Sequence, residues 1–324
     1  MRRFFKAVYN KLGFHSSALI GVLIVVSIVM QIRSPYFLTL ANIEVTLTGF
    51  ILEAIMAVGM TMVIIAGGID LSVSSVLPFS AVVVALLMTA GVPVGAAVAI
   101  TLLLATVVGI INATLKTVLN VHPFIATLAM MLTIRGVAVV LSGGENISGF
   151  PEAFAVLGQG RFLGVAISIW AFAALALIFG LLLHHHRFFQ QIYFVGYDPR
   201  AARVSGINVT LVNYVVFGLS SLLAGFAGIV AASQFGAAHN SFAFGAELKV
   251  IAAVVIGGTN IVRGGRGTMF GTVLGVLFMA IVFNAFAMSG INTYWQEIVN
   301  GVMLLLAIFM VQAVQSREGR SAVG

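Results

Sequence analysis

The chain has 324 residues, of which 61% are hydrophobic and only 8% are charged, and its formal net charge is +7. Soluble domains carry about 25% charged residues, because polar side chains must cover their surface. The composition and the mean hydropathy of +1.15 therefore exclude a soluble enzyme, a secreted disulfide scaffold and a disordered chain, and they predict a protein whose surface lies mostly in lipid.

The positive charge does not indicate nucleic-acid binding. Most of the 16 basic residues lie between apolar runs, as they do in membrane proteins, and we expect no basic stretch that is interleaved with exposed aromatic residues. The sequence contains no cysteine, which excludes disulfides, thiol chemistry and iron–sulfur clusters. The basic N-terminus precedes an apolar run that lacks a small-residue cleavage site, so we interpret this run as an uncleaved first span.

Apolar runs of about 20 residues, the length that a helix needs to cross a bilayer, recur along the chain. Ten such runs lie at 16–32, 44–66, 72–90, 93–116, 121–141, 163–183, 209–233, 244–261, 267–289 and 294–314. The links between them are short and rich in Gly, Asn, Ser and Pro. The sequence therefore predicts an all-α, polytopic membrane protein in which residues 1–324 form a single transmembrane domain.

The basic residues predict the orientation of these spans, because cytoplasmic links carry an excess of Lys and Arg. With the N-terminus in the cytoplasm, alternation places twelve basic residues inside: Arg2, Arg3, Lys6, Lys11, Lys116, Arg187, Arg200, Arg203, Arg263, Arg266, Arg317 and Arg320. Only Arg33 and Arg161 fall outside, so we predict that both termini are cytoplasmic. The outer links 143–151 and 235–240 are too short to form a binding domain, and high-affinity capture of a solute outside would need another protein.

The first informative segment, Gly67-Gly68-Ile69-Asp70-Leu71-Ser72, interrupts the apolar sequence between two predicted spans. The two glycines allow a sharp turn, and Asp70 or Ser72 can cap the next helix. One interpretation is a capped turn, which the pattern alone favours. The other is a broken helix whose polar groups line a pathway where two helix ends meet.

Residues 184–208 form the longest predicted cytoplasmic link. We expect Gly196 and Tyr197 to open a turn. Asp198 then suits the N-cap of a short helix that begins at Pro199, and Gly206 suits its end. The segment expected to contact a partner comprises Gly196, Tyr197, Asp198, Pro199, Arg200, Ala201, Ala202, Arg203 and Gly206. Such a helix could dock on a partner protein or lie among lipid headgroups, and the pattern leaves both interpretations open.

A second glycine-rich segment, Val255–Thr268, echoes the first, because 253–260 matches 63–70 in its apolar residues and its Gly-Gly pair. The match is short but compatible with an internal duplication. The residues that require irregular backbone are Gly257, Gly258, Thr259, Gly264, Gly265 and Gly267. Arg263 and Arg266 should keep the segment out of the membrane. It could bind phosphate, but a glycine-rich turn between spans is the simpler interpretation.

Few residues carry the chemistry of a catalytic or energy-coupling site. No lysine directly follows a glycine, so the chain has no phosphate-binding P-loop. Acidic residues are few and lie mostly near span ends, which disfavours proton-driven transport. The residues expected to line a pathway are Gly67, Gly68, Asp70, Ser72, Glu53, Asn112 and Asn284. We predict no catalytic residue, no cofactor and no metal in this chain, since the successive His184–His186 cannot all face one ion from a helix.

Taken in order, these segments resemble those of the permease subunits of bacterial ABC importers of the ribose, xylose, arabinose and galactose type. That family carries a GGIDLS-like segment and a V-I-G-G-T-x-x-x-G-G-x-G-T segment, which corresponds to Val255–Thr268 here. Its cytoplasmic loop, G-x-x-x-x-A-A-x-x-x-G-I, corresponds to Gly196, Ala201, Ala202, Gly206 and Ile207. The similarity extends along nearly the whole chain, although Ser74-Ser75 and Arg263 depart from the family pattern.

The resemblance implies a permease like those of type II ABC importers, in the bacterial inner (plasma) membrane. Two copies, or one copy with a related permease, would form the pathway for a monosaccharide or sugar-like solute. A separate ATPase with tandem nucleotide-binding domains would bind ATP and Mg, and a periplasmic sugar-binding protein would deliver the solute. The segment Asp198–Ile207 would be the coupling helix. The alternative is a secondary transporter of a small polar solute, driven by an ion gradient and working without an ATPase.

Overall fold

The computed structural model describes the backbone of residues 2–292 and of residues 295, 298, 299, 301, 302, 305 and 309, with side chains from Ser16 onward. This part of the chain is mainly helical, as predicted. The predicted span 294–314 lies almost entirely outside the described residues, so it stays a prediction.

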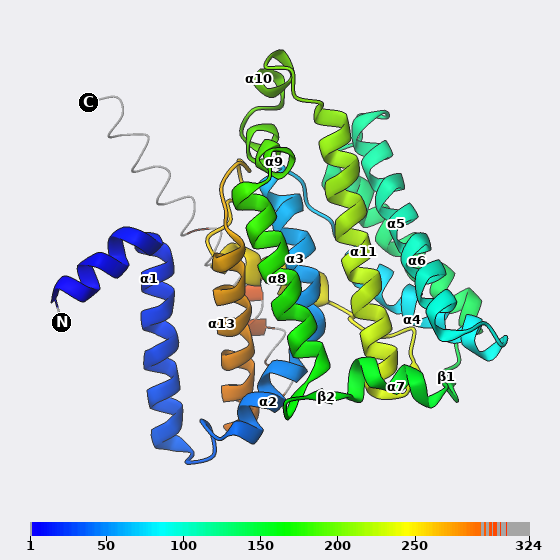
Figure 1. Ribbon diagram of the computed structural model, residues 1–324, viewed down its shortest axis with the longest axis horizontal. Coiled ribbons are helices and arrows are strands. Elements are labelled where there is room, and N and C mark those ends of the chain that lie inside the picture. The colour runs from blue at the N-terminus through cyan, green and yellow to red at the C-terminus, as the bar shows by residue number, and fades with distance from the viewer. Residues whose placement is uncertain are drawn as a thin grey trace.

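The helices lie side by side between two faces of the molecule (Figure 1). The first half of the chain forms α1 (Arg2–Arg33), α2 (Leu40–Gly49), α3 (Ile51–Ile65), α4 (Val73–Thr89), α5 (Val94–Thr117) and α6 (Pro123–Ser142). Then come β1 (Ile147–Ser148), α7 (Glu152–Gln159), β2 (Arg161–Phe162), β3 (Val165–Ala166), α8 (Ile167–His185) and α9 (Arg187–Tyr197). The remaining elements are α10 (Pro199–Val204), α11 (Val209–Phe235), β4 (Ala237–Ala238), α12 (Ala246–Ile256) and α13 (Met269–Met288). We call the two ends of the molecule the α10 face and the α7 face.

Helix α11 forms the centre of the packed interior and contacts α3, α4 and α5. Glycines mark the points of closest approach. A Cβ atom on Gly228 would lie 2.2 Å from the carbonyl oxygen of Leu77, and one on Gly109 would lie 2.2 Å from that of Phe217. Small residues allow such backbone contacts, which stabilise helix association in lipid, where the hydrophobic effect does not drive it.

Helix lengths agree only in part with the predicted spans. Within the described residues, six helices are long and apolar enough to cross a membrane, or seven if α2 and α3, which are bent by 52°, form one span. The clearest difference concerns the predicted run 244–261, because α12 has only 11 residues. A backbone turn at Gly257 and Gly258 ends this helix early, and average hydropathy does not register such a break.

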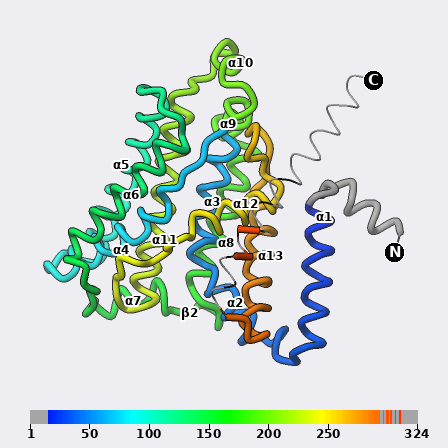
Figure 2. The backbone as a smooth tube through the Cα atoms, turned by 180° about the vertical axis from the view of Figure 1, so that it is seen from behind, coloured from blue at the N-terminus to red at the C-terminus, as the bar shows by residue number. Residues whose placement is uncertain are grey.

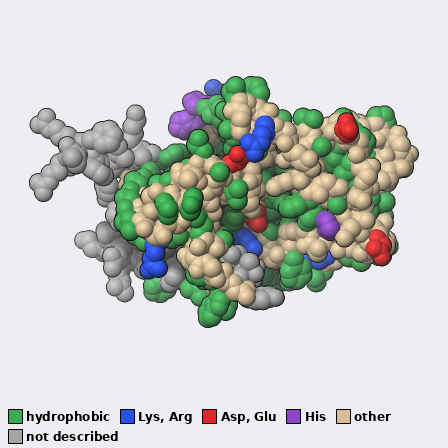
Figure 3. Space-filling view, turned by 90° about the horizontal axis from the view of Figure 1, so that it is seen from below, with side chains coloured by type: hydrophobic (Ala, Val, Ile, Leu, Met, Phe, Trp, Pro, Cys, Tyr) green, Lys and Arg blue, Asp and Glu red, His purple; other side chains and the backbone are tan. Residues whose placement is uncertain are grey.

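The links on the α7 face carry structure that the sequence did not predict. Strands β1 and β4 pair antiparallel, with Ile147 opposite Ala238, so the two outer links lie together. Strands β2 and β3 form a second small hairpin, and α7 packs on α11. Figure 3, a view of this face, shows scattered charged side chains rather than one charged patch. Among the described residues, the salt bridge between Arg161 and Glu44, with a nitrogen–oxygen distance of 3.0 Å, lies here.

Helix α1 lies at the edge of the molecule and packs along α13 (Figure 2). Its outer side chains are apolar and exposed, among them Val25 and Ile32, whose exposed fractions are 59% and 81%. A small apolar cluster of Met30, Phe37 and Ala285 holds the two helices together at one end. Exposed apolar side chains along a helix of this length are expected of a membrane span that faces lipid.

Candidate functional site

The link between α8 and α11 is helical over most of its length. Helix α9 is amphipathic, with Ile192, Val195 and Gly196 buried and Tyr197 exposed. The prediction that Gly196 and Tyr197 open a turn is wrong, because they are the last residues of α9. The helix ends at Asp198, whose backbone is extended, with φ −153°. Glycine often signals a turn, but at position 196 it serves a close backbone contact instead.

The short helix α10 has the predicted cap. The Asp198 carboxylate accepts hydrogen bonds from the backbone N–H groups of Arg200, at 2.8 Å, and Ala201, at 3.1 Å. Pro199 is the first helical residue, where its missing N–H is not needed. Gly206 follows the helix with φ +83°, a left-handed conformation that glycine adopts without strain. This segment is therefore a rigid, locally defined helix.

Helix α10 has an inner side and an outer side. Ala202 is buried, with 4% of its surface exposed, and belongs to the hydrophobic core. Arg200, Ala201 and Val204 are exposed, and Val204 reaches 90%. Ala202 therefore packs inside this chain and does not offer a surface to a partner, whereas Ala201 does.

Three segments that the sequence singled out converge at one point, which we call the glycine junction (Gly67, Gly196, Gly264 and Gly265). The backbone N–H of Gly265 donates to the carbonyl oxygen of Ile65 at 2.8 Å. A Cβ atom on Gly196 would lie 1.7 Å from that same oxygen, and one on Gly264 would lie 3.0 Å from the Gly67 Cα. The turn after α3, the end of α9 and the loop after α12 thus touch backbone to backbone.

The loop after α12 is closed by local hydrogen bonds. Asn260 Oδ1 accepts from the N–H groups of Val262 and Arg263, at 2.9 and 3.1 Å, and the Asn260 N–H donates to the Arg266 carbonyl. These bonds account for the irregular backbone that the glycines predicted. Thr259 is buried, and a Cβ on Gly267 would lie 2.7 Å from its side chain.

Close backbone packing continues from this loop into the two flanking helices. A Cβ on Gly271 of α13 would lie 2.1 Å from the Gly257 carbonyl oxygen, and one on Gly275 would lie 1.9 Å from that of Ala253. The glycines of this region therefore allow α12 and α13 to pack at backbone contact.

A buried hydrogen-bond network surrounds Asp70, which has no exposed surface. Its carboxylate accepts from the Ser72 N–H at 3.1 Å, from the Ser72 hydroxyl at 2.5 Å and from the Ser220 hydroxyl of α11 at 2.9 Å. Asn112 Nδ2 of α5 donates to Ser72 Oγ at 2.8 Å. Asp70 therefore bonds to Ser72, the N-cap residue of α4, although no side chain caps the first turn of this helix. Through Ser72 and Ser220 the network ties the start of α4 to α5 and α11.

Two other predicted pathway residues lie apart from this network. Glu53 sits in the first turn of α3, close enough to Lys249 of α12 for an electrostatic interaction. Asn284 of α13 exchanges two hydrogen bonds of 3.0 Å with Asn42 of α2. A reciprocal amide pair between helices is the role that such residues often have in membrane interiors. The structure thus brings Asp70, Ser72 and Asn112 together but separates Glu53 and Asn284 from them.

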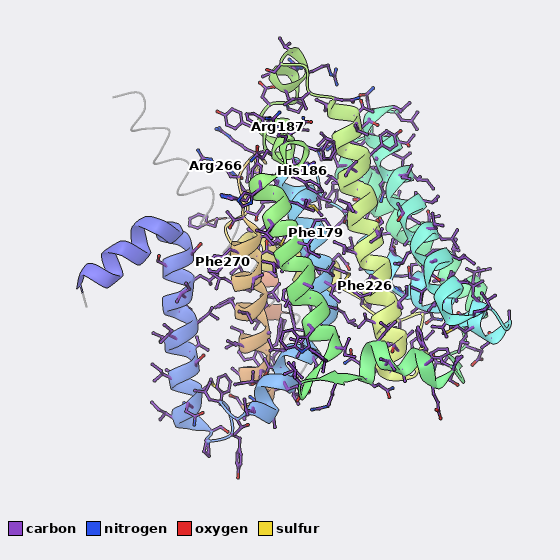
Figure 4. All side chains as sticks on the ribbon, in the orientation of Figure 1. Phe179, His186, Arg187, Phe226, Arg266 and Phe270 are labelled. Carbon is purple, nitrogen blue, oxygen red and sulfur yellow. The ribbon has the colours of Figure 1, made fainter. Side chains whose placement is uncertain are left out.

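Sequence reasoning missed two contributors. Ser220 completes the Asp70 network, and its only signal was a Ser-Ser pair in an otherwise apolar span. Tyr193 of α9 donates its hydroxyl to the Gly267 carbonyl at 3.1 Å, and burial raises the pKa of Tyr193 above its ordinary value, so it remains a donor at neutral pH. Figure 4 shows that His186, Arg187 and Arg266 lie at this same end of the molecule.

The chemistry available in this arrangement is structural and polar. In the described part of the chain, no group of three or more His, Cys, Asp or Glu residues is placed to hold a metal ion. The arrangement offers hydroxyl, amide and carboxylate groups inside the helix bundle and a rigid helix on the α10 face.

Comparison with known proteins agrees with this geometry. Residues 42–308 match the profile of the family described as branched-chain amino acid transport system / permease component. The chain is 39% identical to the ribose import permease protein of Escherichia coli K12, a match that covers 90% of this chain and 92% of that protein. No solved structure matches the chain.

Two further relatives are named for other sugars. The L-arabinose ABC transporter permease protein of Azospirillum brasilense is 35% identical, over 91% of this chain and 87% of that protein. The galactose/methyl galactoside import permease protein of Salmonella typhimurium LT2 is 32% identical, over 92% and 94%. Since both the profile and these relatives match over most of its length, the chain belongs to this family of multi-pass inner-membrane permease components of ABC importers.

Proposed function

We propose that this chain forms the transmembrane pathway of an ATP-driven importer for a monosaccharide or a closely related solute. The family profile is described by amino-acid transport, but the relatives compared above are permeases for ribose, arabinose and galactose. The observation that carries the proposal is the 39% identity to a ribose permease along 90% of the chain.

The proposed assembly contains proteins that supply what this chain lacks. The sequence has no P-loop, so ATP and Mg would bind to a separate ATPase with tandem nucleotide-binding domains. A periplasmic binding protein would deliver the sugar, and a second permease chain would complete the pore. In this assembly the chain has ten spans and both termini in the cytoplasm. A single cysteine at Ser316 tests that topology, because labelling of this cysteine from the periplasm of intact cells would contradict it.

Helix α10 is the proposed contact with the ATPase. The contact requires a stiff helix with an accessible outer side, and α10 has a side-chain cap and the exposed residues Arg200, Ala201 and Val204. The basic side chain of Arg200 suits acidic groups on the partner.

The test replaces Ala201 by Trp in the complete transporter. If α10 sits in a groove of the ATPase, the large side chain should clash, and both co-purification of the ATPase and ATP-dependent uptake should fall. Val140→Trp is the matched control, because Val140 is 81% exposed in α6 and lies far from α10. Unchanged uptake and unchanged co-purification for Ala201→Trp would mean that α10 lies on lipid instead, where Trp is well tolerated.

A further inference from the structure

A pocket of about 280 Å³ lies beside α10, and it is lined partly by exposed residues. The ends of α3, α5 and α9, the start of α11 and the loop after α12 all contribute to its wall. The side chains that define its chemistry are Lys116, Arg203, Arg263 and Asn213. We call this cavity the basic pocket. Its volume lies near the lower end of the range for small-molecule sites, about 300–1,000 Å³.

The basic pocket concentrates positive charge. Lys116, Arg203 and Arg263 come from three different elements, and none of the residues that line the pocket is acidic. In the described part of the chain, no carboxylate lies within salt-bridge distance of these three side chains. Lys116 contacts the ring of Phe217, with 5.4 Å between its nitrogen and the ring centre, a contact that leaves its hydrogen-bond donors available. Three cations that line one pocket without an acid suit a phosphate group, which Arg and Lys bind by charge-assisted hydrogen bonds.

The pocket also contains a hydrogen-bond acceptor that an anion cannot use. Asn213 is only 2% exposed, and its Nδ2 donates to the Val209 carbonyl at 2.8 Å. Its Oδ1 is itself buried and has no partner among the described residues. A buried acceptor without a donor is costly and rare. A hydroxyl group on the ligand would satisfy it once the Asn213 side chain turns toward the pocket. The hydroxyls of Thr117 and Thr210 add further polar groups to the same wall.

We propose that the basic pocket binds a sugar monophosphate, with the phosphate on the three cations and a sugar hydroxyl on Asn213. A phosphoryl-transfer reaction on the imported sugar would supply this ligand on the cytoplasmic side. Pro199 and Arg203 of α10 line the pocket, so the bound ligand would join α10 to α5 and to the loop after α12. The ligand would restrain α10. Transport would therefore fall when the sugar monophosphate accumulates in the cytoplasm. This regulatory step rests on the proposed function, whereas the binding step does not.

Binding is tested on the purified full-length permease in nanodiscs of neutral phosphatidylcholine, with ribose 5-phosphate as the probe and calorimetry as the readout. We expect saturable binding of ribose 5-phosphate and none of ribose. Arg263→Gln and Lys116→Gln should each weaken binding about tenfold, the effect of losing one charge-assisted contact of about 1.4 kcal/mol. Arg187→Gln is the matched control, because Arg187 is an exposed basic residue at the same end that does not line the pocket.

Three results would overturn the proposal: no binding of ribose 5-phosphate, equal binding by the pocket variants and the control, or loss of all binding when phosphatidylglycerol replaces part of the neutral lipid. The last result would identify the site as one for lipid phosphate. In the complete transporter, ribose 5-phosphate should lower ATP-dependent uptake in the wild type but not in Arg263→Gln. If uptake does not depend on an ATPase at all, the proposed function fails while the calorimetric result on the permease still stands.

Discussion

The turn after α3 and the turn after α12 begin in the same way and then diverge. Each helix ends in a Schellman motif, with a left-handed glycine, Gly67 or Gly258, as the first residue past the cap. In each, the N–H of the following residue bonds back to the last helical turn, from Gly68 to Val63 and from Thr259 to Val254. The repeated Gly-Gly pair in the sequence therefore encodes the same helix ending, although the left-handed glycine is the first of the pair in one turn and the second in the other.

The two turns differ in the polar residue that comes two positions after the Gly-Gly pair, which is Asp70 in the first and Asn260 in the second. Asp70 and Asn260 each accept from the N–H two residues later. Asp70 then reaches Ser220 on another helix, and α4 begins three residues later at Val73. The bonds of Asn260 stay within its own loop, and α13 begins only at Met269. The same local motif thus starts a buried helix in one place and an exposed loop in the other, because only the first has polar partners inside the bundle.

The largest effect is expected where the two turns meet. In Gly196→Ala the new methyl would lie 1.7 Å from the Ile65 carbonyl, so α9 must separate from both turns. We expect the free energy of unfolding to fall by about 4 kcal/mol or more, a loss that marks disrupted core packing. Thermal unfolding of the purified protein measures it. Gly136→Ala in α6 is the control, because nothing lies within 4 Å of the added atom, and its stability should change by about 1 kcal/mol at most. Equal melting temperatures for the two variants would contradict the packing at the junction.

Replacing Asp70 or Asn260, the second residue after each Gly-Gly pair, by Ala compares the two turns directly. Asp70→Ala leaves two buried hydroxyls and one N–H without their acceptor and should cost about 3 kcal/mol. Asn260→Ala removes two local bonds and should cost about 1–2 kcal/mol. Asp70→Asn, which keeps one acceptor oxygen, should fall between them and impair uptake. A larger loss of stability in Asn260→Ala than in Asp70→Ala would reverse the comparison.

The smallest change in stability is expected when only the hydrogen bond between Asp70 and Ser220 of α11 is removed. Ser220→Ala removes the hydroxyl that donates to Asp70 and should cost about 1 kcal/mol. Its neighbour Ser221 is equally buried, but its hydroxyl has no partner in the part of the chain that the structure describes, so Ser221→Ala should be neutral or stabilising. The melting temperatures of Ser220→Ala and Ser221→Ala test this difference. If they shift alike, the contact between Asp70 and α11 contributes nothing to the difference between the two turns.

Local features of this protein were predictable from the sequence, and contacts between distant segments were not. The cap at Asp198 and the stop at Gly206 depend on neighbouring residues, so their pattern indicated them correctly. The convergence at the glycine junction depends on how helices pack, and a lone Gly196 carries no sign of its partners. The role of Asn284 was equally hidden. A polar residue that lines a pathway and one that bonds to another helix look the same in the sequence of a span.

The start of α4 has an electrostatic consequence. The helix begins at Val73 inside the packed interior, and Ser72 provides no side-chain cap. The aligned peptide dipoles of a helix place about half a positive charge at its N-terminus, and no salt reaches this one to screen it. Asp70 lies beside that end and accepts the N–H of Ser72, so a negative charge on its carboxylate would lie next to the positive end of the helix dipole. The start of α4 is therefore a buried point where an acid and a helix end can stabilise each other, and an uncharged residue at position 70 would leave the helix dipole without that partner.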